Sequence, residues 1–131
     1  MFIDSSALVA ILLREPEADH LADRMSGQSR TLLTSPLAIF ETTAALVRVK
    51  RISAAAAEAR VRAILAMAGI EIVSIDDAVG RAAIDAFERY GKGRGHPAQL
   101  NMGDCFSYAI ARLSGVELLY KGDDFARTDL G

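Results

Sequence analysis

The chain has 131 residues, which suffices for one compact domain with its own hydrophobic core but not for two domains of ordinary size. Apolar residues make up 51% of the sequence, yet no apolar run approaches the roughly 20 residues that a membrane-spanning helix needs. One cysteine and two histidines exclude an internal disulfide and an ordinary zinc site, and the net charge of −2 argues mildly against nucleic-acid binding, which generally calls for a basic surface.

Short β-like segments alternate with helical patterns along the chain. This alternation predicts one α/β domain over residues 1–131, with helices layered on a central, mainly parallel sheet of about four strands. The predicted strands are residues 1–4, 30–34, 70–75 and 117–120.

Helical patterns fill the segments between these strands. Pro16 breaks the first pattern into two helices, residues 6–14 and 17–25. A third helix is predicted over residues 35–50, because a serine suited to an N-cap and a first-turn proline stand at its start.

Two further helices carry apolar residues at helical spacing, and Ser53 is suited to cap the first of them. Residues 91–97 hold three glycines and a proline, so they are predicted to form a loop. A last helix is predicted over residues 101–113, with Gly115 ending it. The apolar positions predicted to face the core are Ala57, Val61, Ile64, Leu65 and Ala68 in one helix and Val79, Ala83, Phe87 and Tyr90 in the next.

Asp4 stands at the end of the first predicted strand, directly after Phe2 and Ile3. Ligands gather at the carboxyl ends of strands in open parallel sheets, so a carboxylate at this place is a candidate for function. A cap on the helix that follows is the structural alternative. Taken alone, the position of Asp4 favours the cap.

Glu41 lies in the third predicted helix, next to Phe40 and close to Ala44. A carboxylate on such an apolar face is costly to desolvate without a partner, which favours a binding role. A surface position at the margin of the apolar stripe explains Glu41 equally well. Arg48 lies two turns along the same side of the helix and is a candidate partner.

Asp104 lies in the first turn of the last predicted helix, three residues after Asn101. This spacing is typical of a capping box, in which the acid accepts a hydrogen bond from the N-cap amide. Gly103 directly precedes the acid and allows another group to approach closely. We interpret Cys105 as buried packing rather than as a nucleophile, because no histidine or lysine stands near it in the sequence.

Asp123 and Asp124 follow the last predicted strand, which again places carboxylates at the carboxyl end of a strand. A solvated turn explains this pair equally well when it is taken alone. The joint pattern is stronger, because all these acids would converge on one edge of one sheet. Carboxylate oxygens suit Mg²⁺ or Mn²⁺, and a bound divalent ion would reverse the negative charge locally.

Several segments, in this order and spacing, closely resemble PIN-domain toxins of the VapC type, and together they cover essentially the whole chain. The resemblance implies a three-layer PIN-like fold and a metal centre formed by Asp4, Glu41 and Asp104. It also implies a fourth acid after the last strand, for which Asp123 and Asp124 both remain candidates and Asp123 is preferred. The segments are residues 1–7 (MFIDSSA), Glu41, residues 100–109 (LNMGDCFSYA), residues 118–125 (LLYKGDDF) and residues 128–129 (TD).

The same resemblance implies a Mg²⁺- or Mn²⁺-dependent endoribonuclease that cleaves RNA phosphodiesters and inhibits translation and growth. It further implies a cognate VapB-type antitoxin, a homodimer, and a higher assembly with the antitoxin. The first residues contain no basic leader or cleavage site, so we expect a cytoplasmic protein with no membrane partner. Candidate contacts to the RNA backbone, which solvated charge runs explain equally well, are Lys92, Arg94 and His96 in the loop and Arg48, Lys50 and Arg51 at a helix end.

Two other interpretations remain open at this point. A magnesium-dependent phosphoryl-transfer protein also uses a strand-end aspartate, although Ser6 stands where a phosphatase of the haloacid-dehalogenase kind needs a second aspartate. A non-catalytic binding module would use the same acids only as caps and turns. Labelling by a small phosphodonor would favour the first, and failure to bind a divalent metal would favour the second.

Overall fold

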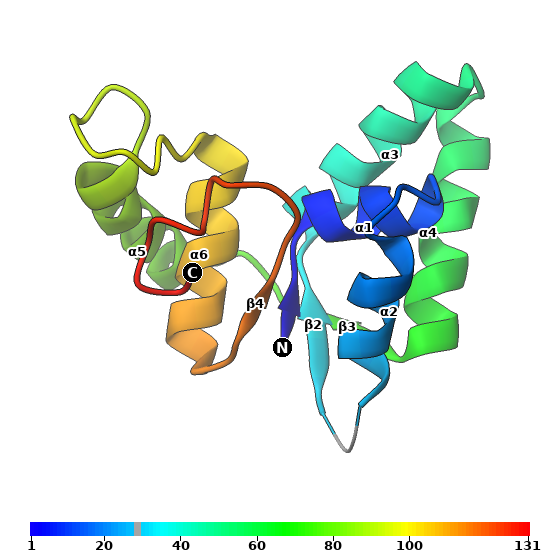
Figure 1. Cartoon of the computed structure of the whole chain (residues 1–131), viewed down its shortest axis with the longest axis horizontal. Helices are drawn as coiled ribbons and strands as arrows, with labels where there is room; N and C mark the ends of the chain where they lie inside the picture. The colour runs from blue at the N-terminus through cyan, green and yellow to red at the C-terminus, as the bar shows by residue number, and fades with distance from the viewer. Residues whose placement is uncertain (28–29) are drawn as a thin grey trace.

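The computed structural model describes residues 1–27 and 30–131. Its sheet has four parallel strands in the order β3-β2-β1-β4, so β1 lies between β2 and β4 (Figure 1). All the strands are short, because each pairs over only a few residues before the chain turns into a helix or loop. The strands are β1 (Phe2–Ile3), β2 (Leu32–Thr34), β3 (Ile70–Ile72) and β4 (Leu118–Leu119).

Within the residues that the structure describes, six helices cover the two faces of this sheet. On one face lie α1 (Ser5–Leu12), α2 (Ala18–Ser26), α3 (Pro36–Lys50) and α4 (Ala54–Ala68), and on the other lie α5 (Asp77–Tyr90) and α6 (Met102–Ser114). The three layers confirm the predicted α/β architecture (Figure 1).

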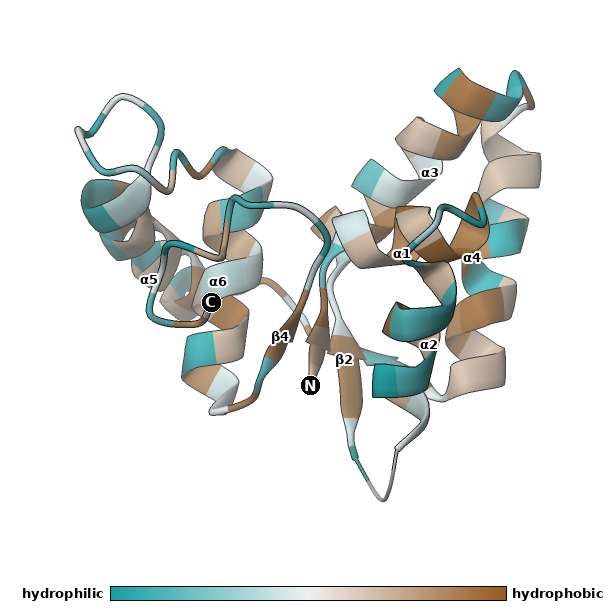
Figure 2. Cartoon of the chain, in the orientation of Figure 1, coloured by the Kyte–Doolittle hydropathy of each residue, from teal (hydrophilic) through white to brown (hydrophobic). Residues whose placement is uncertain are grey.

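Successive side chains of β1 and β4 point to opposite faces of the sheet, so the hydrophobic core is divided into two clusters. Ile3 and Leu119 pack into the cluster formed with α1–α4, whereas Phe2 and Leu118 pack into the cluster formed with α5 and α6. Because of this alternation, β1 and β4 each contribute to both cores. The labelled strands β2 and β4 are largely hydrophobic, whereas α4 mixes hydrophobic and hydrophilic residues (Figure 2).

The predicted helix caps are present. The hydroxyls of Ser35 and Ser53 accept hydrogen bonds from the amides of Ala38 and Ala56, each at 3.1 Å. Gly115 ends α6 with a φ of 64°, in the left-handed region where glycine carries no steric penalty.

Several predicted boundaries and positions were wrong. The first helix begins at Ser5 and ends at Leu12 rather than spanning residues 6–14, because the backbone at Arg14 adopts a φ of 54°. The third and fourth strands end before residues 75 and 120, where strand pairing stops. Phe87 and Ala68 are exposed rather than core-facing, since α5 packs through Ala83 and its neighbours, and Ala68 is the last residue of its helix.

The order of the strands places a crevice at the carboxyl end of β1. The crossover that leaves β1 runs through α1 and α2 on one face of the sheet, whereas the crossover that enters β4 runs through α5 and α6 on the other face. This arrangement opens a ligand site between the two adjacent strands. The amide of Asp4 donates to the carbonyl of Leu119 at 2.9 Å, so β1 and β4 end side by side. Within the described residues no helix has both the length and the apolar character needed to cross a bilayer.

Candidate active site

Asp4 is buried at the end of β1, with 2% of its surface exposed, and both of its carboxylate oxygens are hydrogen-bonded. Oδ2 accepts from the amide of Ser6 at 3.0 Å and from the Ser6 hydroxyl at 2.6 Å. Oδ1 accepts from the hydroxyl of Ser107 at 2.6 Å, which reaches across from α6. The side chain therefore caps α1, as the structural alternative required, and also faces the first turns of α6.

Asp104 is buried in the first turn of α6 and forms the capping box that its spacing predicted. Its Oδ2 accepts from the amide of Asn101 at 3.1 Å, and its own amide donates to Asn101 Oδ1 at 2.9 Å. Burial raises the pKa of Asp104 to about 7; the bond from Asn101 opposes this rise, and the negative charges of Asp4 and Asp124 add to it. Asp104 is thus both a cap and a member of a cluster of like charges.

Glu41 is half-buried on α3 and points at the start of α6. Burial raises its pKa, the charge of Asp4 raises it further, and a hydrogen bond with Ser5 opposes both. A Cβ atom added to Gly103 would lie only 2.1 Å from Glu41 Oε2, so the glycine leaves the space that the carboxylate occupies. Arg48 is exposed further along the helix and does not contribute to the pKa of Glu41.

The loop after β4 brings an exposed acid to the cluster. Asp124 raises the pKa of Asp104 both by its charge and through a side-chain hydrogen bond. Asp123 is also exposed but is not among the groups that act on Asp104. Sequence analysis preferred Asp123 as the fourth acid, whereas in the structure Asp124 is the one that acts on Asp104.

Four carboxylates from four separate elements influence one another in pairs. Asp4 acts on both Glu41 and Asp104, and Asp124 acts on Asp104. Mutual repulsion of this kind favours a bound cation, and carboxylate oxygens are the donors that Mg²⁺ and Mn²⁺ prefer. The donors are therefore of the chemical type that suits a hard divalent cation. Their side-chain positions do not yet form a site, because no three or more acidic, histidine or cysteine groups among residues 1–27 and 30–131 are arranged to hold one ion.

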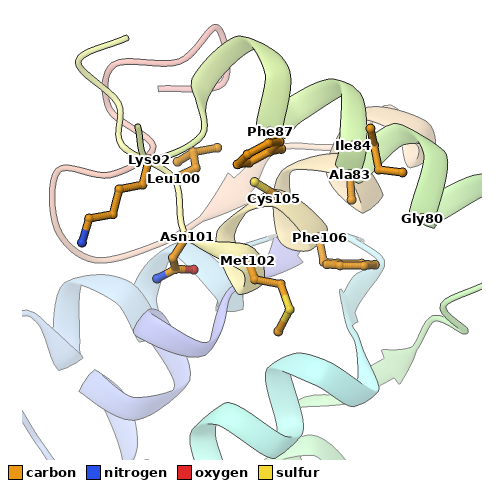
Figure 3. Close-up of a pocket in the computed structure, with 10 residues that line it drawn as sticks. All are labelled: Gly80, Ala83, Ile84, Phe87, Lys92, Leu100, Asn101, Met102, Cys105 and Phe106. Atoms are coloured by element: carbon orange, nitrogen blue, oxygen red, sulfur yellow. The ribbon is translucent and has the colours of Figure 1, made fainter. Parts of the chain in front are cut away.

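An apolar groove of about 320 Å³ lies beside this cluster, between α5 and the start of α6 (Figure 3). Ile84, Phe87 and Met102 line it and remain 67%, 45% and 68% exposed. Lys92 supplies the one charged side chain among the lining residues. Cys105 is buried among the lining residues and belongs to the core cluster of α5 and α6, in agreement with a packing role, and burial raises the pKa of its thiol to about 11.

Two of the three predicted RNA-contacting residues in the loop after α5 form contacts with other residues of the chain. Arg94 pairs with Glu88 at 2.7 Å. His96 Nδ1 accepts from the amide of Ala98 at 3.0 Å, and its ring meets Tyr90 edge-on. The cationic side chains of Lys92, Lys50 and Arg51 are exposed.

Sequence reasoning gave no role to the residues that surround Asp4. Ser6 and Ser107 bind its carboxylate, and the amide of Lys121 donates to the Ser6 hydroxyl at 3.0 Å. All three residues lie inside the segments that resemble the PIN-domain toxins. The sequence signal that could have identified the two serines is a hydroxyl residue close to each acid. Their partners are distant in sequence, and only the fold reveals them.

Comparison with known proteins shows the family of the chain. The PIN-domain family model matches residues 1–130. A protein of Rhizobium meliloti named as a VapC ribonuclease is 45% identical over 140 residues, covering 99% of both chains.

Two solved structures share the fold at 18% sequence identity. One is VapC20 from Mycobacterium tuberculosis, described as a toxin that cleaves the sarcin–ricin loop, with a TM-score of 0.74 over 98% of this chain and 94% of that one. The other is a toxin–antitoxin complex from Klebsiella pneumoniae, with a TM-score of 0.71 over 98% of this chain and 92% of that one.

Proposed function

The chain belongs to the PIN-domain family, and from this premise we propose that it is a metal-dependent endoribonuclease, the toxin of a VapBC-type module. The observation that carries the proposal is the approach of three acids to one another at the carboxyl edge of the sheet: Asp4 accepts a hydrogen bond from Ser107 of α6, Glu41 lies against Gly103, and Asp104 follows that glycine. Full-length similarity to a VapC ribonuclease supports the same activity. We further propose that it acts in the cytoplasm on RNA.

In the proposed mechanism Asp4, Glu41 and Asp104 hold the cation through their carboxylate oxygens. Mg²⁺ or Mn²⁺, when bound, supplies an activated water and stabilises charge on the phosphate. Asp124 completes the cluster or orients the water, and Asp123 is the alternative for this role. Burial of Asp4 and Asp104 limits competing water around these oxygens, and their bonds to neighbouring groups fix where they point.

RNA is expected to bind across this edge of the sheet. The acids alone would repel phosphates, so binding requires positive charge from the cation and from neighbouring side chains. Lys92 lies at the mouth of the apolar groove next to the site, and Lys50 and Arg51 lie at the far end of α3. These exposed cations are the candidates to track the RNA backbone.

The enzymatic proposal is tested by incubating total RNA with the purified chain and Mg²⁺ or Mn²⁺, and repeating the reaction in chelator. We expect cleavage only with metal, and loss of cleavage in Glu41→Gln, which removes the charge but keeps the size. Cleavage that persists in chelator would contradict metal dependence. Labelling of Asp4 by a small phosphodonor, with RNA left intact, would instead support phosphoryl transfer.

We propose a cognate VapB-type antitoxin as the partner that silences the site. Like charges in the cluster attract a cation, so an inserted arginine would take the place of the metal and form charge-assisted hydrogen bonds. The complex among the structural neighbours supports a partner of this kind. A complex in which the acids stay open and cleavage stays intact would refute the idea.

We also propose a homodimer, formed over the apolar groove between α5 and α6. Permanent interfaces are more apolar than ordinary surface, and Ile84, Phe87 and Met102 expose apolar surface together. The groove lining carries little charge for a charged partner to recognise, which favours a second copy of the chain. A monomer in light scattering at micromolar concentration would contradict this proposal.

A further inference from the structure

The Ser6 hydroxyl connects two parts of the acid cluster. It donates to Asp4 Oδ2 at 2.6 Å and accepts from the Lys121 amide at 3.0 Å. Asp4 ends β1, whereas Lys121 begins the loop that carries Asp124 and passes beside the start of α1 (Figure 1). One side chain therefore ties the buried acid to the segment that supplies the exposed acid.

A second attachment holds the same loop from outside. The Lys121 ammonium pairs with Glu15 at 2.8 Å and with Glu17 at 3.2 Å, in the connection between α1 and α2. These side chains are partly exposed, so water and salt weaken their attraction. The hydroxyl of Ser6 is the attachment that touches the acid cluster directly.

The bonds to Asp4 also determine which of its oxygens remains available. A carboxylate offers about four acceptor positions, two on each oxygen. Oδ2 accepts from both the amide and the hydroxyl of Ser6, whereas Oδ1 accepts only from Ser107 among the described residues. The free acceptor position therefore lies on Oδ1, and the two serines fix the rotation that presents it.

We propose that Ser6 is a positioning residue that sets the affinity of the acid cluster for a divalent cation. It would do so by fixing the Asp4 carboxylate and by holding the loop of Asp124 against it. The inference rests on the metal-dependent function proposed above. Loss of an outer partner of this kind typically weakens metal binding by roughly 10–100-fold.

The test is calorimetric titration of Mn²⁺ alone into the purified full chain. Ser6→Ala removes both bonds and is expected to bind Mn²⁺ roughly 10–100-fold more weakly. Ser6→Thr keeps a hydroxyl and is expected to restore most of the affinity. Ser6→Cys fills similar space with a weak donor, so its affinity for Mn²⁺ should also fall. This variant carries the test if Ser6→Ala folds poorly.

Ser53→Ala is the matched control, because it removes the same atom from another helix start. The Ser53 hydroxyl caps α4 at 3.1 Å from the Ala56 amide and is not part of the cluster. This variant should lose stability but keep its Mn²⁺ affinity. Equal affinity in Ser6→Ala and the unaltered chain would overturn the inference alone. Absence of Mn²⁺ binding by the unaltered chain would overturn the proposed function and the inference with it.

Discussion

Replacing Asp104 by asparagine separates its role as a cap from its role in the acid cluster. Asparagine keeps the size of the side chain and an oxygen that can accept from the Asn101 amide. It loses the negative charge that the proposed metal centre needs and that Asp4 and Asp124 repel. We therefore expect Asp104→Asn to abolish metal-dependent RNA cleavage and to raise stability in chelator.

The magnitude follows from the raised pKa of Asp104. The difference between 3.8 and about 7 corresponds to about 4 kcal/mol, at 1.36 kcal/mol for each pH unit, and this is the upper limit of the gain. Because the folded chain holds this proton more tightly, the contribution of Asp104 to stability is most favourable below pH 3.8, falls as the pH rises towards about 7, and then stays low. A neutral acceptor weakens the bond from Asn101 by about 1 kcal/mol. A net gain of about 1–3 kcal/mol is expected at pH 8.

Thermal unfolding in chelator at pH 8 and at pH 5 measures this gain. The gain should shrink at pH 5, where Asp104 of the unaltered chain is already protonated. Asp76→Asn is the control, because Asp76 accepts from the Val79 amide at 3.0 Å as the cap of α5 and lies outside the acid cluster. This variant should change the free energy of unfolding by less than about 0.5 kcal/mol. A less stable Asp104→Asn variant that still cleaves RNA would refute the reasoning and leave Asp104 a cap.

Three further substitutions test neighbouring features. Gly103→Ala should displace Glu41 and reduce RNA cleavage at least tenfold, which corresponds to roughly 1.4 kcal/mol of lost transition-state stabilisation. Urea unfolding should show no loss of stability, because alanine is a better helix former than glycine. Asp129→Ala should cost about 1–3 kcal/mol by leaving the O–H of Tyr108 without its acceptor, while cleavage per folded molecule stays unchanged. Ile84→Glu should convert the proposed dimer to monomer in light scattering, and a persisting dimer would place the interface elsewhere.

Local chemistry in the sequence determined most of the secondary structure. Ser35 and Ser53 cap helices because a hydroxyl one residue before a helix satisfies a free amide, and this depends on neighbours only. The short strands were located but their ends were not, because strand pairing decides where a strand stops. Phe87 was misplaced for a related reason, since the packing angle of α5 on α6 selects which side of its apolar stripe is buried.

Sequence reasoning also identified the acids but left each of them with two explanations. Asp4 and Asp104 turned out to be helix caps and members of one cluster, because the carboxyl end of β1 lies beside the first turn of α6. The glycine before Asp104 predicted a close approach, and the structure identifies the approaching group as Glu41.

Only the tertiary structure shows that Asp124 rather than Asp123 acts on Asp104, and only it reveals the serines around Asp4. Adjacent residues of a loop point in different directions, and their direction depends on what anchors the loop. Here the anchor is a hydrogen bond from Lys121 to Ser6, two residues far apart in the chain. The sequence determines which charges are available, whereas their approach to one another depends on contacts that form only when the sheet brings distant strand ends together.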